Sequence, residues 1–205
     1  MASTWVPAWA GVAWLAVYAV IAGGHLSHLA RAGGGERAWH ATHVLMAAGM
    51  IDMFWPGGSM PVGSAAGQAV FAAAAAVAAA GIAVAAARRR PAGRLWVLSA
   101  ADLAVMYYMF ALSSVRYLIA FTVLLAAWQA AEALAWASGY LSPAPAAVLA
   151  AGGGGGAVAA RRPGSGGHSG LAVRVGLAVM SLGMGYMLLA MQFGMPNPGP
   201  AMPGM

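Results

Sequence analysis

Long apolar segments alternate with short connections rich in glycine, proline and arginine along the chain. Each apolar segment has about 20 residues, the length that an α-helix needs to cross a hydrocarbon core of about 30 Å. We therefore predict an all-α fold, a polytopic membrane helical bundle with six transmembrane helices. These helices cover approximately residues 5–28, 37–55, 64–87, 95–112, 117–137 and 171–193. Within this single integral membrane domain, residues 138–170, with their run of glycines, are predicted to form a flexible cytoplasmic linker.

The arginines predict how the helices are oriented. With six spans, the first, third and fifth connections lie on one side of the membrane, and they hold every arginine except Arg116. Basic residues in short loops mark the cytoplasmic side. We therefore expect these connections to be cytoplasmic and both the N-terminus and the C-terminus to lie outside. The expected location is the cytoplasmic (inner) membrane of a bacterium.

Composition agrees with a membrane protein. Hydrophobic residues make up 62% of the chain and charged residues 7%, whereas about 25% of a soluble domain is charged. The net charge of +6 would suit nucleic-acid binding, but the arginines lie between apolar segments. We therefore expect the lipid bilayer, and no nucleic acid, as a partner; protein partners are left open. The chain has no cysteine, so disulfides and thiolate metal sites are excluded and a soft-metal site would have to use methionine.

Methionine is frequent, with 14 residues, and most of them follow helical spacing on three predicted spans. The stripes consist of Met46, Met50 and Met53 on the second span, Met106 and Met109 beside Asp102 on the fourth, and Met180, Met184, Met187 and Met191 on the sixth. Most of these side chains fall in the outer half of the predicted membrane. Thioether sulfur favours Cu(I), but methionine also fills irregular gaps in a core. The stripes therefore indicate either a copper site or core packing.

Histidine shows the opposite distribution. The pairs His25-x-x-His28 and His40-x-x-His43 have the i, i+3 spacing that puts two side chains on one helix face. The first two spans form an antiparallel hairpin, so we expect His28 to face His40 and His25 to face His43 at the cytoplasmic end. Four imidazoles there predict a metal site for copper, with zinc as an alternative. The other interpretation is interfacial histidines bonded to the backbone, to lipid headgroups or to Glu36.

Three acidic residues fall inside predicted spans. Asp52 lies near the outer end of the second span, Asp102 at mid-depth on the fourth, and Glu132 in the inner half of the fifth, close to Gln129. Ionisable residues inside a membrane are costly and often mark ion or proton paths. A proton or cation path is therefore one interpretation. In the other, each acid is neutralised by protonation, by a polar neighbour or, near the outer surface, by Arg116.

The stretch HATHVLMAAGMIDMFW, with the alanine-rich third span and the methionine-lined last span, resembles the actinobacterial polytopic membrane proteins grouped as DUF5134. The resemblance implies a small multi-span membrane protein of unknown function. It assigns no role to His43, Met46, Met50 or Met53.

Three classes of function remain open. We prefer handling of a transition metal, copper(I) first, by binding, transfer or transport through the methionine stripes, Asp102 and the histidines. The second class is an intramembrane enzyme that depends on a metal or on haem. The third is a non-catalytic scaffold or assembly partner. No Ser/His/Asp order, P-loop, G-x-G-x-x-G or H-E-x-x-H motif is present, so no catalytic residue is predicted.

Overall fold

The computed structural model describes residues 7–55, 60–89, 93–112, 119–141 and 166–194. These residues form six α-helices and, in this part of the chain, no strand: α1 (Ala8–Leu29), α2 (Gly34–Met53), α3 (Ser64–Ala87), α4 (Arg94–Leu112), α5 (Ile119–Ala137) and α7 (Gly166–Gly194). The all-α prediction is confirmed. Helix α7 begins inside the predicted linker, and residues 142–165 of that linker lie outside the described residues, as do Met195, Met202 and Met205.

Five of these helices, all except α2, are long and apolar enough to cross a membrane. Their outward faces are apolar as well: Val20 on α1 is 76% exposed, Val77 on α3 73% and Leu134 on α5 71%. Such surfaces suit lipid rather than water. The molecule is therefore a multi-pass membrane protein.

Helix α2 is not among these candidate spans, because its polar residues lower its mean hydropathy. Glu36, Arg37, His40, Thr42 and His43 all lie in its first half. Of these side chains, His40 and His43 are buried, where α2 packs along α1 and also contacts α4, whereas Glu36 and Arg37 are exposed. The helix therefore depends on the rest of the bundle for its place in an apolar environment.

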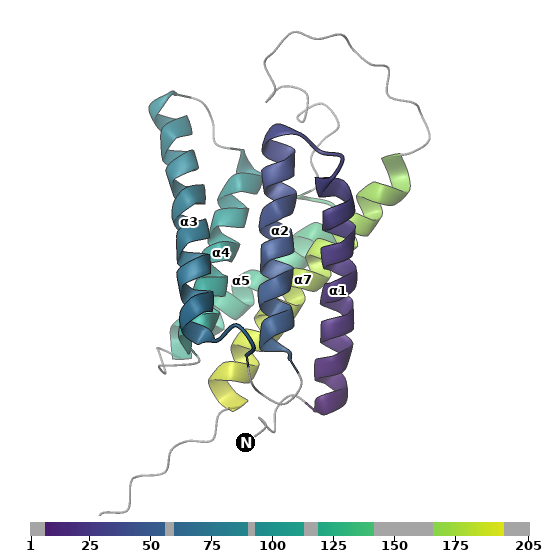
Figure 1. Ribbon diagram of the computed structural model, residues 1–205, viewed down its shortest axis with the longest axis vertical. Coiled ribbons are helices and arrows are strands. Elements are labelled where there is room, and N and C mark those ends of the chain that lie inside the picture. Colours follow the sequence, from purple (N-terminus) through teal and green to yellow (C-terminus); the bar gives the residue numbers. More distant parts are fainter. Residues whose placement is uncertain (1–6, 56–59, 90–92, 113–118, 142–165, 195–205) are drawn as a thin grey trace, which may run out of the picture.

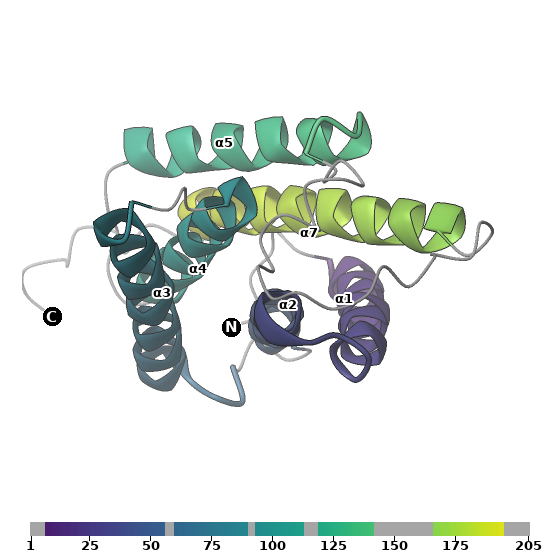
Figure 2. The same cartoon turned by 90° about the horizontal axis from the view of Figure 1, so that it is seen from above.

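The helices pair as antiparallel neighbours, α1 with α2, α3 with α4, and α5 with α7. Figure 1 shows the α1–α2 and α3–α4 connections at the same end of the bundle, with α7 crossing obliquely behind α2. Seen from above, α5 and α7 run side by side as a separate layer against the first four helices (Figure 2). Helices α1 and α4 both contact α7, which joins the two layers.

A methionine-rich apolar core fills the space between the layers. Met46 and Met50 of α2 are fully buried, as are Met106 and Met109 of α4. Space there is short: a Cβ atom on Gly49 would lie 2.6 Å from the Met106 Cε and 2.6 Å from the Phe71 Cζ. The small residue makes room on α2 for the side chains of Phe71 from α3 and Met106 from α4.

The α1–α2 connection is tight and well defined. The chain leaves α1 after Leu29, and Gly34 opens α2 with φ of +54°, a left-handed conformation that glycine adopts at no steric cost. The Arg37 Nε donates to the carbonyl oxygen of Ala32 at 3.1 Å, which fixes the turn from the α2 side. This short turn sets the register of the two helices, and with it the positions of their histidines.

Candidate metal centre

The α1–α2 hairpin brings its four histidines into contact. The imidazole rings of His25 and His43 stack with centroids 5.0 Å apart and planes 11° apart, and those of His28 and His40 stack at 5.1 Å and 10°. His25, His40 and His43 are each 4% exposed. The pairing follows from the hairpin, because residues at equal distances from the turn lie opposite each other.

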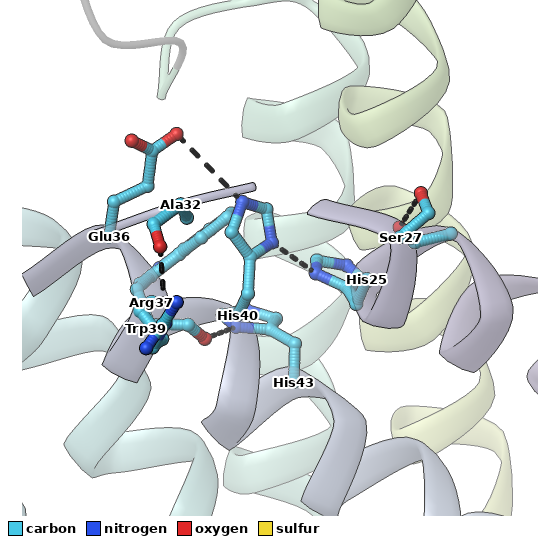
Figure 3. A network of polar contacts seen from close by, with 9 residues as sticks. His25, Ser27, Ala32, Glu36, Arg37, Trp39, His40 and His43 are labelled. Atoms are coloured by element: carbon cyan, nitrogen blue, oxygen red, sulfur yellow. Dashed lines mark hydrogen bonds and ion pairs between the residues drawn. The ribbon is translucent and has the colours of Figure 1, made fainter. Parts of the chain in front are cut away.

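Hydrogen bonds join His25 to His40 and His43 to the backbone (Figure 3). The Nδ1 atoms of His25 and His40 are 2.9 Å apart, so one ring donates and the other accepts. The His43 Nδ1 lies 2.8 Å from the carbonyl oxygen of Trp39, which can only accept. His43 therefore carries its proton on Nδ1, and its Nε2 keeps a lone pair. A backbone carbonyl that fixes the tautomer in this way is the usual outer-shell partner of a metal-binding histidine.

An acid and an indole border the histidines. The Glu36 Oε1 lies 4.0 Å from the His40 Nε2, with the glutamate side chain 62% exposed. The Trp39 ring packs against His43, with centroids 4.3 Å apart, and against His40 at 4.9 Å. The sequence-based interpretation did not include Trp39. Its spacing of four residues before His43 was the available signal, since i, i+4 side chains meet on a helix.

The nitrogen atoms of the four histidines do not surround a common point in this structure. Within the described residues, no group of three or more histidine and acidic side chains is placed to hold a metal ion as it stands. The closest approach is the 2.9 Å between the Nδ1 atoms of His25 and His40. Two imidazole nitrogens that bind one metal at about 2.0–2.1 Å lie roughly 3.3 Å apart at the tetrahedral angle, so these two rings have to move slightly apart to share an ion. A third donor requires that His28 or His43 turn about its side-chain bonds.

The predicted methionines lie elsewhere, in the apolar core. All nine share one contiguous cluster, seven of them buried and Met53 and Met191 at its edge. The buried members are Met46, Met50, Met106, Met109, Met180, Met184 and Met187. Aromatic rings of the same cluster, including Phe71 and Phe110, pack among them. These thioethers fill the core, and Met46 follows His43 by one helical turn.

Asp102, the remaining predicted ligand, faces neither the histidines nor a thioether ligand set. Its Oδ1 accepts a hydrogen bond of 2.9 Å from the Gln129 Nε2 on α5. Asp52 is likewise engaged locally: its Oδ1 accepts from the backbone N–H of Val62 at 2.8 Å and so holds the α2–α3 connection. Both acids are 6% exposed. The predicted site residues therefore fall into three places: the histidines of the α1–α2 hairpin, the methionines of the apolar core, and Asp102, which bonds to Gln129 between α4 and α5.

The fold and these buried polar groups define a class, that of multi-pass helical membrane proteins with ionisable residues inside the bundle. The family model of the domain of unknown function DUF5134 matches residues 35–191. The chain belongs to this family. No curated protein and no solved structure matches the chain significantly.

Proposed function

We propose that this protein handles a transition metal, copper(I) first, at the histidines of the α1–α2 hairpin. The observation that carries the proposal is the 2.9 Å contact between the Nδ1 atoms of His25 and His40. His25 and His40 would hold the ion through their Nδ1 atoms, with release of the proton between them, after the two rings move apart. The neighbouring His28 or His43 would turn to supply a third imidazole nitrogen.

The His43 tautomer supports the same proposal. Its Nδ1–H is held by the Trp39 carbonyl oxygen, so the Nε2 lone pair is the free one. Neutral imidazole is the form that binds metal, and an outer-shell acceptor raises its basicity. Trp39 also covers the rings and keeps bulk water from them. These features favour an ion held directly by imidazoles over a haem, because stacked rings in contact leave no room for a macrocycle between them.

The metal preference rests on the methionine core. Met46 lies one turn beyond His43 on α2 and is fully buried, as is Met50 one turn further. Thioether sulfur binds Cu(I) and has little affinity for zinc. We propose that the core methionines pass Cu(I) between the far side of the membrane and the histidines.

The direction of this path depends on orientation. We propose that all six helices span a bacterial cytoplasmic membrane, α2 included, with both termini outside and the α1–α2 connection in the cytoplasm. The arginine distribution supports this orientation, since Arg31, Arg37, Arg88 and Arg94 all fall at one end of the bundle. The histidines then lie at the cytoplasmic end of the metal path.

Competition between the detergent-solubilised protein and a chromophoric Cu(I) chelator, under anaerobic reducing conditions, tests the proposal. The double variant His25→Gln/His40→Gln removes both nitrogens of the central contact but keeps polar side chains. We expect its Cu(I) affinity to fall by more than the roughly 10–100-fold that loss of an outer-shell partner costs. The matched control is His168→Gln, which alters the fifth histidine, at the start of α7. Equal affinities of the wild type and the double variant would overturn the proposal.

A further inference from the structure

A second polar group is buried between α4 and α5, away from the histidines. Gln129 is fully buried, and Asp102 and Glu132 are each 6% exposed. Gln129 Nε2 donates to Asp102 Oδ1 at 2.9 Å, and Trp136 Nε1 donates to Glu132 Oε1 at 3.2 Å. Glu132 follows Gln129 by three residues, about one turn along the same face of α5, so both acids adjoin the same amide. Two acids from different helices thus lie around one buried glutamine.

No basic side chain balances them. Among the described residues, neither Asp102 nor Glu132 forms an ion pair. Helix α7 packs against α5 next to Gln129, through Gly185. The arginine of α7, Arg174, instead donates to the backbone carbonyl oxygens of Trp136 and Ala137 at 3.3 and 2.8 Å. Two carboxylates beside the same buried amide would repel each other in these apolar surroundings.

The hydrogen bonds of the group are also incomplete. The Gln129 Oε1 and the Glu132 Oε2 are both buried without a hydrogen-bond partner in the described structure. Both atoms are acceptors, and so is every oxygen of the two carboxylates. The N–H groups of Gln129 and Trp136 are too few to serve them all. The group is therefore short of donors, and a carboxylic O–H supplies a donor without any other rearrangement.

We propose that Asp102 and Glu132 form a proton-binding site inside the membrane, in which the two carboxyl groups share one proton. Gln129 responds to the protonation state. In the observed state, Asp102 Oδ1 is unprotonated and accepts a hydrogen bond from Gln129 Nε2. When a second proton binds to Oδ1, the Gln129 amide rotates by half a turn, and its Oε1 accepts the hydrogen bond from the new O–H. The site is independent of the histidines and would serve proton uptake and release across the bundle.

Infrared spectroscopy of the metal-free protein in lipid vesicles tests this site. The chain has only four acidic residues, so a band from a protonated carboxylic acid can be assigned by substitution. We expect the wild type to show such a band at neutral pH, with a shift in D₂O. The band is lost in Asp102→Asn and in Glu132→Gln. It persists in the matched controls Asp52→Asn, another buried acid, and Glu36→Gln, an exposed one.

A further variant keeps both acids and changes only their partner. Gln129→Leu should retain the acid band but shift its frequency, because the hydrogen bond to Asp102 is gone; a merely structural role for Gln129 would leave the band unshifted. This variant also serves if the acid variants fail to fold, as judged by circular dichroism and gel filtration. Absence of the band at neutral pH overturns the proposal. So does a band that appears only when Na⁺ is removed, since the oxygens would then bind a cation instead of a proton.

Discussion

At Gly67, α3 has no room for a side chain, because the ring of Phe110 on α4 occupies the place of a Cβ atom. Next to it, the Gln68 Nε2 donates to the carbonyl oxygen of Phe110 at 3.3 Å. These two contacts fix how α3 and α4 meet. A single residue without a side chain thus decides the distance between two membrane helices, where association depends on close packing.

Substitution of this glycine should therefore weaken the bundle. We expect Gly67→Ala to lower the free energy of unfolding by about 1–3 kcal/mol, the usual cost of overpacking, because an aromatic ring moves less easily than a flexible chain. Gly81→Ala on the same helix is the control, since a Cβ atom there meets nothing within 4 Å. Thermal unfolding in detergent measures both. Equal melting temperatures for the two variants would show that Phe110 yields without cost.

At the scale of the element, helical spacing predicted which side chains share a face. It placed the histidines opposite each other, since that requires only two antiparallel helices and a short turn. It did not predict that Asp102 hydrogen-bonds to Gln129 and so lies near Glu132, one turn further along α5. Counting residues put the two acids at different depths of the membrane. Tilt is set by packing between helices and is not visible in a single segment.

The methionine stripes make the sharpest prediction at this scale. In the triple variant Met50→Leu/Met106→Leu/Met184→Leu, three core thioethers become hydrocarbon of similar volume. Such swaps cost less than about 1.5 kcal/mol each, so the fold survives. If the core conducts Cu(I), the affinity of the protein for Cu(I) falls; the affinity for Zn²⁺ stays as in the wild type because imidazoles bind it. Unchanged Cu(I) affinity would show that the methionines only pack the core, and it would contradict the proposed preference of the protein for copper.

At the scale of the whole molecule, apolar segments and their connections were enough to predict an all-helical membrane bundle. The pattern did not reveal its arrangement, with α5 and α7 forming a layer that crosses the other four helices (Figure 2). Nor did it show that α2, whose own sequence is more polar than that of the other helices, is partly buried by its neighbours. Contacts between helices far apart in sequence decide both features, and one sequence holds no direct record of them.

Orientation can be tested directly because the chain has no cysteine. We expect a cysteine at Val62 to react with a membrane-impermeant maleimide in intact cells, and a cysteine at Gly33 to react only after permeabilisation. Both positions tolerate the change: Val62 is 59% exposed and the space around Gly33 is open. Gly33 lies in the α1–α2 connection and Val62 in the α2–α3 connection, and these two connections are at opposite ends of α2 (Figure 1). The reverse labelling pattern would invert the proposed topology.

The central claim is that the α1–α2 histidines bind a transition metal, and metal content tests it most directly. The protein is expressed with copper, zinc and iron available, purified in detergent and subjected to elemental analysis beside the variant in which His25, His28, His40 and His43 are all alanine. We predict close to one metal ion per wild-type chain and none in the variant, since the ligands are removed while the helices remain. Equal metal content in the two proteins, including none in either, would contradict the claim and favour a structural role for the histidines.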